Sequence, residues 1–133
     1  MNKQALRRAV ISLFGAAAFV GAPLVWAQSG PIVGVSVDAA GKVLVSSTVV
    51  TSSSGQTLVS YRMTTTGFVF PAGGVNVEGG AFTCAVVEGG RVARCRKVGA
   101  HEPGKRYAVQ LQVMATGGGS MMAPGVDIWI QND

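Results

Sequence analysis

The sequence has 133 residues and a formal net charge of +5, from 11 Lys and Arg against 6 Asp and Glu. Three of the basic residues lie within residues 1–27, so the rest of the chain has eight basic residues against six acidic ones, a balance of +2. A balance this small argues against a protein that binds nucleic acids through general basicity. A chain of this length is enough for one domain with one core.

The N-terminal segment has the layout of a secretory signal peptide. Lys3, Arg7 and Arg8 give it a basic start. An apolar stretch over 9–24 follows, and Val25-Trp26-Ala27 supplies small residues at the two positions that a signal peptidase reads. The apolar stretch is short for a stable membrane span, and no second one follows. We therefore expect this segment to be cleaved during export.

Cleavage after residue 27 would leave a single domain over residues 28–133, in the periplasm of a bacterium or secreted from it. No cysteine stands at the cleavage site, so lipid attachment there is excluded. We expect a soluble product with no transmembrane anchor. The adjacent Arg7 and Arg8 leave both the general secretory route and the twin-arginine route open.

After the signal, short segments of alternating apolar residues are separated by turns rich in Gly, Pro and Ser. These segments are 33–37, 43–51, 59–63, 68–70, 82–87, 91–98, 107–113 and 126–130. Their spacing and alternation predict an all-β fold, an antiparallel immunoglobulin-like β-sandwich of about seven to eight strands.

The hairpin over 82–98 carries the two cysteines of the chain. A turn at Gly89-Gly90 places Cys84 directly opposite Cys95, within the range that a disulfide accepts. Glu88 and Arg91 then pair with opposite charge. A two-residue loop would put the cysteines at a hydrogen-bonded pair, and a four-residue loop at the closer, non-bonded pair. In an oxidising compartment the pair predicts one structural disulfide.

The same hairpin carries a resemblance to a known family. Phe82-Thr83-Cys84, Gly89-Gly90-Arg91-Val92, Cys95 and Pro103-Gly104 are followed by a long alternating strand from Lys105. This order resembles the repeated immunoglobulin-like domains of bacterial surface proteins. The resemblance implies a structural or adhesive module rather than an enzyme, and it transfers no catalytic residue.

The sharpest candidate for a binding surface is a group of basic residues in and after the hairpin. They are Arg91, Arg94, Arg96, Lys97, Lys105 and Arg106. Such a group would suit an anionic partner, such as lipopolysaccharide phosphate, an acidic glycan or an acidic protein surface. The alternative is a solvated sheet face whose charges prevent edge-to-edge aggregation. In this register Arg94 and Arg96 project from one face, and Lys97 from the other.

Trp129 is the second candidate. If Val126, Ile128 and Ile130 face the core, Trp129 faces outward, where it would suit contact with carbohydrate or protein. The alternative is that its ring only covers part of the sheet.

Metal binding and hydrolysis have weaker support. His101 with Met114, Met121 and Met122 would offer soft ligands for copper, although the methionines also serve as ordinary apolar filler. No metal or other cofactor is favoured.

A hydrolase triad would have to combine His101, the only histidine, with a serine such as Ser120 and with Asp127 or Asp38. No Gly-x-Ser-x-Gly motif accompanies these residues.

The sequence therefore predicts an exported, non-enzymatic protein of the cell envelope that acts in binding, adhesion or structural interaction. Trp129 and the basic hairpin are its candidate surface, and an envelope protein or an anionic glycan is the expected partner. A periplasmic protein that binds a small ligand or copper is the alternative, and a hydrolase is less favoured. Nucleic acid is not an expected partner, because few aromatic residues interleave with the basic ones.

Overall fold

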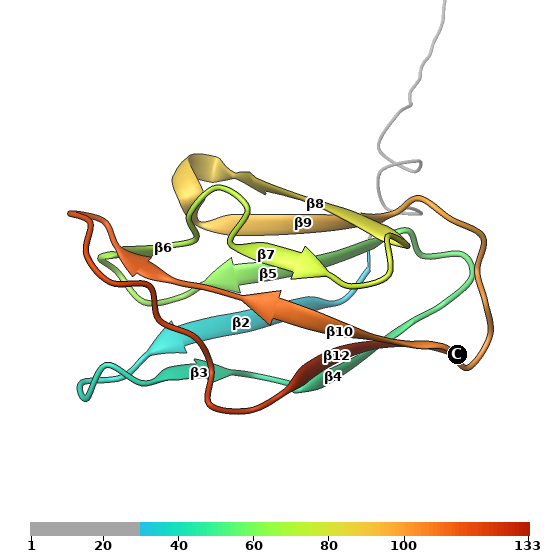
Figure 1. Cartoon of the computed structure of the whole chain (residues 1–133), viewed down its shortest axis with the longest axis horizontal. Coiled ribbons are helices and arrows are strands. Elements are labelled where there is room, and N and C mark those ends of the chain that lie inside the picture. Colours follow the sequence, from blue (N-terminus) through green and yellow to red (C-terminus); the bar gives the residue numbers. More distant parts are fainter. Residues whose placement is uncertain (1–29) are drawn as a thin grey trace, which may run out of the picture.

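The computed structural model describes residues 30–133, so the predicted signal peptide over 1–27 lies outside the described residues. The described part is all-β, with 11 strands and a single 3-10 turn at Glu88–Gly90. Within it, no helix is long and apolar enough to cross a membrane. The strands form two larger sheets and one short ribbon, packed as a sandwich (Figure 1).

One layer is a five-stranded sheet in the order β3-β2-β5-β9-β8. Its strands are β2 (Ile32–Val37), β3 (Val43–Val45), β5 (Leu58–Met63), β8 (Phe82–Val87) and β9 (Val92–Lys97). Its neighbours pair antiparallel except β2 and β5, which run parallel.

The other layer is a four-stranded sheet in the order β4-β12-β10-β7. Its strands are β4 (Val49–Ser52), β7 (Val75–Val77), β10 (Arg106–Leu111) and β12 (Ile128–Asn132). Here β12 pairs parallel with β4 and antiparallel with β10. A short ribbon of β6 (Phe68–Val69) and β11 (Met114–Ala115) extends one end of the sandwich.

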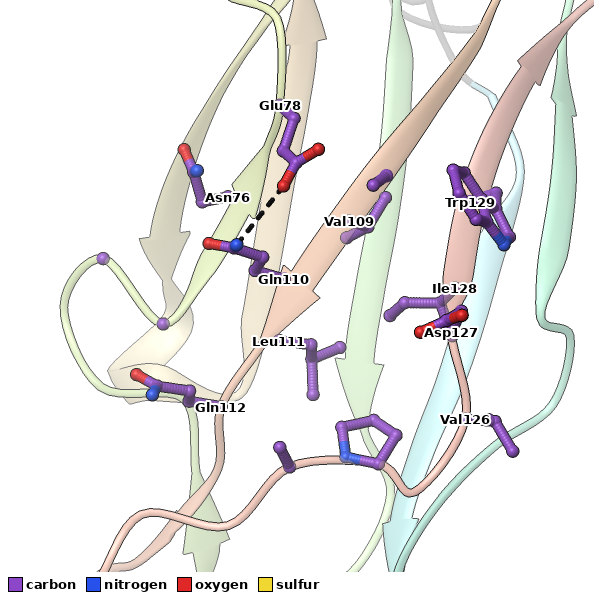
Figure 2. A pocket seen from close by; sticks show the side chains of 15 residues that line it. Asn76, Glu78, Val109, Gln110, Leu111, Gln112, Val126, Asp127, Ile128 and Trp129 are labelled. Atoms are coloured by element: carbon purple, nitrogen blue, oxygen red, sulfur yellow. Dashed lines mark hydrogen bonds between the residues drawn. The ribbon is translucent and has the colours of Figure 1, made fainter.

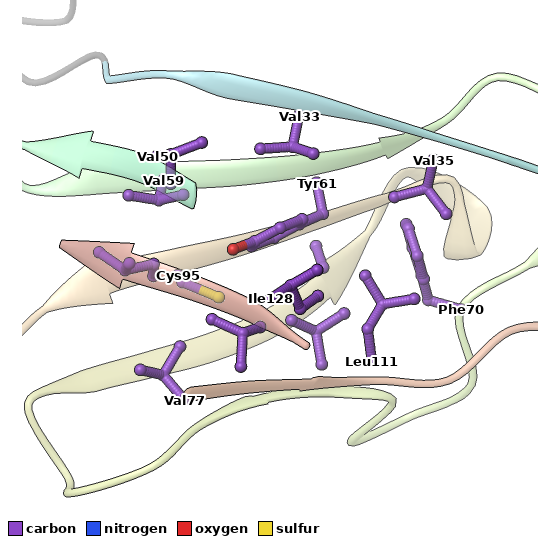
Figure 3. Close-up of a cluster of buried hydrophobic side chains, with 14 of the residues drawn as sticks. Val33, Val35, Val50, Val59, Tyr61, Phe70, Val77, Cys95, Leu111 and Ile128 are labelled. Carbon is purple, nitrogen blue, oxygen red and sulfur yellow. The ribbon is translucent and has the colours of Figure 1, made fainter. Parts of the chain in front are cut away.

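The core lies between the two larger sheets and is built from every second residue of their strands. Val33 and Val35 of β2 and Val59 and Tyr61 of β5 meet Ile130 of β12 in one cluster of buried side chains. Figure 3 shows side chains from both layers converging there. The alternate residues of each strand point outward, so each larger sheet has one outer face available for chemistry.

The predicted all-β sandwich with one disulfide is confirmed, and its strand pairing differs from the expectation in two respects. There are 11 described strands rather than seven or eight, partly because the segment 43–51 splits into β3 and β4, which belong to different sheets. The sheets are mixed, because β2–β5 and β4–β12 are parallel pairs. Alternation along a strand reports which face is buried and not the direction of the neighbouring strand.

The last strand begins and ends two residues later than predicted, at Ile128–Asn132 instead of 126–130. Ile128 and Ile130 are buried, whereas Val126 lies before β12 and is 57% exposed, so the condition that all three face the core holds only for the two isoleucines. The chain reaches β12 through Pro124 and Gly125. Residues that precede the paired part of a strand need not alternate between the core and the outer face.

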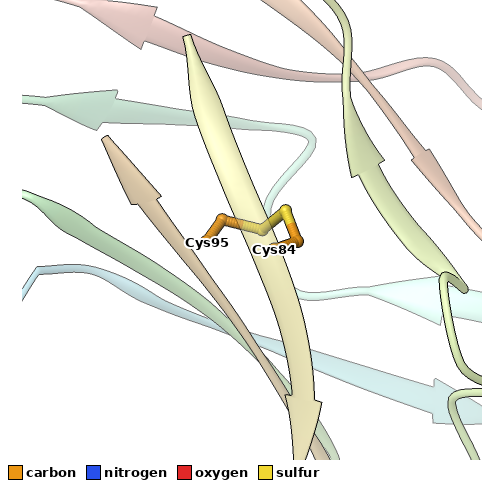
Figure 4. Close-up of a disulfide and its surroundings, with 2 residues drawn as sticks. All are labelled: Cys84 and Cys95. Atoms are coloured by element: carbon orange, nitrogen blue, oxygen red, sulfur yellow. A yellow bond between two sulfur atoms is a disulfide. The ribbon is translucent and has the colours of Figure 1, made fainter. Parts of the chain in front are cut away.

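The disulfide hairpin has the predicted register. Cys84 and Cys95 pair directly and are bonded, with their Cα atoms 3.9 Å apart (Figure 4). Strand β8 ends at Val87 and β9 begins at Val92, so the loop has four residues and the cysteines occupy the closer, non-hydrogen-bonded pair. The predicted pairing of charge between Glu88 and Arg91 is wrong: Glu88 bonds Arg94 at 2.8 Å instead.

Removal of the disulfide is expected to lower the free energy of unfolding by roughly 2–3 kcal/mol, because the bond restricts the unfolded chain. Urea unfolding of the Cys84→Ala, Cys95→Ala double variant against the wild type measures this loss. Wild type with reductant is the control, since reduction breaks the bond without shortening a side chain. A loss below about 1 kcal/mol in both would contradict the expectation.

Burial of Tyr61 predicts a loss of stability at alkaline pH. The side chain is 1% exposed, and burial raises the pKa of its phenol well above the ordinary 10.0. Above about pH 10 the unfolded chain releases this proton and the folded chain keeps it, so stability is present below that pH and falls as the pH rises. Urea unfolding at about pH 9 and about pH 11 should show this fall, and Tyr61→Phe should reduce it. Tyr107→Phe is the control and should show the same fall in stability as the wild type. If Tyr61→Phe also shows the wild-type fall, the effect comes from other groups.

Candidate functional site

A groove lies on the outer face of the four-stranded sheet, and we call it the Trp129 groove. Residues from three neighbouring strands form its centre. Trp129 on β12 pairs with Ala108 on β10. The backbone N–H of Glu78, which follows β7, donates a 2.9 Å hydrogen bond to the carbonyl of Ala108. Because Ala108 has only a methyl group, the larger Trp129 and Glu78 side chains rise on either side of it. The hollow has a volume of about 610 Å³.

Polar side chains line the groove opposite Trp129. Asn76 and Gln110 are paired residues of β7 and β10, and Gln110 Nε2 donates to Glu78 Oε2 at 3.4 Å. Gln112 and Asp127 line the groove as well. Figure 2 shows the carboxylates and amides gathered around the groove, with Trp129 across from Glu78. These groups offer both donors and acceptors to a ligand.

The Trp129 ring is partly exposed and is held from one side. The Arg106 guanidinium lies 5.3 Å from the centre of the ring, and its Nε donates to Gln131 Oε1 at 2.9 Å. Trp129 therefore points outward, as the alternation predicts, and Arg106 orients it through a cation–π contact. A fixed aromatic ring beside hydrogen-bonding groups suits a ligand with one apolar face and several hydroxyl groups.

The predicted basic surface is divided between the two layers. Arg94 and Arg96 project from β9 on the outer face of the five-stranded sheet. Arg106 projects from β10 on the outer face of the other sheet, and Lys105 pairs with Glu102 at 3.2 Å. The six basic residues therefore do not form one surface, because the chain crosses from one layer to the other between β9 and β10.

Two of these basic residues make contacts within the fold. Arg91 Nη1 donates to the carbonyls of Thr65 and Phe68 at 2.8 and 2.9 Å. Lys97, on the opposite face of β9 from Arg96 as predicted, donates to His101 Nδ1 at 2.8 Å. Burial lowers the pKa of Lys97, and the negative charge of Asp133 acts in the opposite direction and raises it.

The residues of the less favoured hydrolase triad are not brought together. His101 Nε2 lies 3.1 Å from the backbone carbonyl of Asp133 and 3.4 Å from its carboxylate, and its other nitrogen faces Lys97. The Asp38 carboxylate instead accepts backbone hydrogen bonds within a turn, and Asp127 lines the Trp129 groove.

The copper ligands proposed from the sequence are also separated. His101 contacts Asp133 at the end marked C in Figure 1, whereas Met114 pairs with Val69 of β6 at the opposite end. Met122 is bridged to Val113 beside this ribbon, and Met121 is 51% exposed. Among the described residues, no three His, Cys, Asp or Glu side chains gather into a metal-binding group.

The sequence alone did not point to the polar residues that line the groove opposite Trp129. Asn76 and Glu78 flank the buried Val77, and Gln110 lies between the buried Val109 and Leu111, so outward polar positions are visible in the alternation. What the sequence does not reveal is that β7 and β10 are neighbours. Comparison with protein-family models and with curated proteins found no match for the chain.

Arg91 is expected to contribute to stability rather than to binding. Its substitution by alanine leaves two part-buried carbonyls without their donor, and should lower the free energy of unfolding by about 1–3 kcal/mol. Arg94→Ala removes an ion pair whose side chains are about half exposed, and should cost at most about 1 kcal/mol. Urea unfolding of both variants tests the difference, and equal losses would contradict it.

Proposed function

We propose that this protein is an exported, non-enzymatic binding module that holds a neutral glycan in the Trp129 groove. The observation that carries the proposal is the placement of a partly exposed Trp129 across Ala108 from Glu78. The apolar face of a sugar ring would stack on the indole, and its hydroxyl groups would reach the Glu78 carboxylate and the amides of Asn76 and Gln110 on the other side.

The charges around the groove favour a neutral ligand over an anionic one. Glu78 and Asp127 bring two carboxylates to the lining, and no basic side chain is among the described residues that line the groove. The Arg106 guanidinium lies beside the groove and is already in contact with Trp129 and Gln131. An acidic sugar would approach uncompensated negative charge, which costs free energy. We therefore assign the groove a neutral oligosaccharide in place of the anionic glycan expected from the basic residues.

An exported location agrees with the Cys84–Cys95 disulfide, since such bonds persist in oxidising compartments. The resemblance to immunoglobulin-like repeats of bacterial surface proteins agrees with a binding or adhesive role. Both are support for the proposal, and the ligand chemistry rests on the groove alone.

An array of neutral and acidic oligosaccharides, probed with the mature chain, tests the proposal. Trp129→Ala removes the stacking surface and should weaken binding of a retained neutral sugar at least about tenfold. Ala108→Leu should weaken it as well, because it fills the floor of the groove without removing a polar group.

Arg94→Ala on the opposite face is the matched control and should bind as the wild type does. Absence of binding to every neutral sugar, or binding that Trp129→Ala leaves unchanged, would overturn the assignment. Recovery of shortened sugars after incubation would contradict a non-enzymatic role.

A further inference from the structure

The outer face of the five-stranded sheet combines arginines with aliphatic side chains. Across its strands Ile32 of β2 pairs with Ser60 of β5, Ser60 with Arg94 of β9, and Arg94 with Ala85 of β8. The small Ser60 and Ala85 leave the guanidinium of Arg94 standing between them. The face is hollowed, with a volume of about 690 Å³.

Three arginines line this hollow: Arg62, Arg94 and Arg96. No aspartate or glutamate is among the described residues that line it. Glu88, in the hairpin loop, pairs with Arg94, and no ion pair engages Arg62 or Arg96 within residues 30–133. The face therefore carries net positive charge, and guanidinium groups bind phosphate oxygens in pairs of hydrogen bonds.

Exposed aliphatic side chains lie in the same hollow. Ile32 is 63% exposed and Val98 is 56% exposed, and Leu58 is partly exposed beside them. Ile32 and Val98 are among the most exposed large apolar residues of the described chain, and both lie on the face that carries the arginines. A hydrated polyanion would leave these side chains exposed to water, whereas the boundary between the headgroups and acyl chains of a bilayer would bury them.

We propose that this face docks on an anionic phospholipid bilayer, with Arg62, Arg94 and Arg96 at the headgroup phosphates and Ile32 and Val98 inserted beside them. The combination of positive charge with exposed aliphatic groups on one face carries the proposal. The docked orientation turns the opposite sheet, and with it the Trp129 groove, away from the bilayer. The proposal does not depend on what the groove binds.

Sedimentation with vesicles tests the proposal, using the mature chain and vesicles of phosphatidylcholine with or without phosphatidylglycerol. We expect binding only when phosphatidylglycerol is present, with weaker binding as salt is added. Arg94→Glu with Arg96→Glu should lower the affinity at least about tenfold. Lys42→Glu with Lys105→Glu makes the same change in net charge away from this face, and should keep most of the binding.

A second pair of variants separates a bilayer from a soluble polyanion. Ile32→Ser with Val98→Ser leaves every charge in place and should weaken vesicle binding, without altering retention on a dextran sulfate column. Equal loss in both charge-reversal pairs would assign binding to net charge and overturn the proposal. Retention on dextran sulfate with no vesicle binding would overturn it in favour of an acidic glycan. Circular dichroism of each variant confirms that it is folded.

Discussion

The structure depends on one constraint: each strand gives only every second residue to the core. On β10, Tyr107 and Val109 are buried while Arg106 and Gln110 are exposed. The core can therefore be built almost entirely from aliphatic and aromatic side chains, without recruiting the polar residues of the same strands. Those polar residues are left in ordered rows on two outer faces, with spacings fixed by the strand ladders. Both proposed binding surfaces are consequences of this division.

Much of the fold could be predicted because its signals are local. The turn at Gly89-Gly90 fixes the pairing of Cys84 with Cys95, and alternation fixes the outward position of Trp129. Pairings between distant strands leave no such signal. The hairpin arginines and Arg106 are close in sequence yet lie on different sheets. Conversely, Glu78 is far from Trp129 in sequence, and only the placement of β7, β10 and β12 brings them to one groove.

The two outer faces differ in chemistry although one core supports both. The Trp129 groove has carboxylates and amides around an aromatic ring, whereas the opposite face has guanidinium groups among aliphatic side chains. The tight β8–β9 hairpin, closed by the disulfide, fixes the strand that carries Arg94 and Arg96. Arg91 secures the same hairpin to the segment after β5 through the carbonyl of Thr65. A basic residue can thus stabilise the fold while Arg94 and Arg96, three and five positions further along the chain, remain available to a partner.

The position of β12 has a consequence for how the molecule is assembled. This strand comes last in the described chain, yet it lies between β4 and β10 and is the only described link between them. A chain synthesised as far as residue 127 holds every other described strand, but β4 has no neighbour and one side of the core stays open to water. Closure of the sandwich therefore requires contacts between distant parts of the chain, because β4 pairs only with the strand that comes last among the described residues.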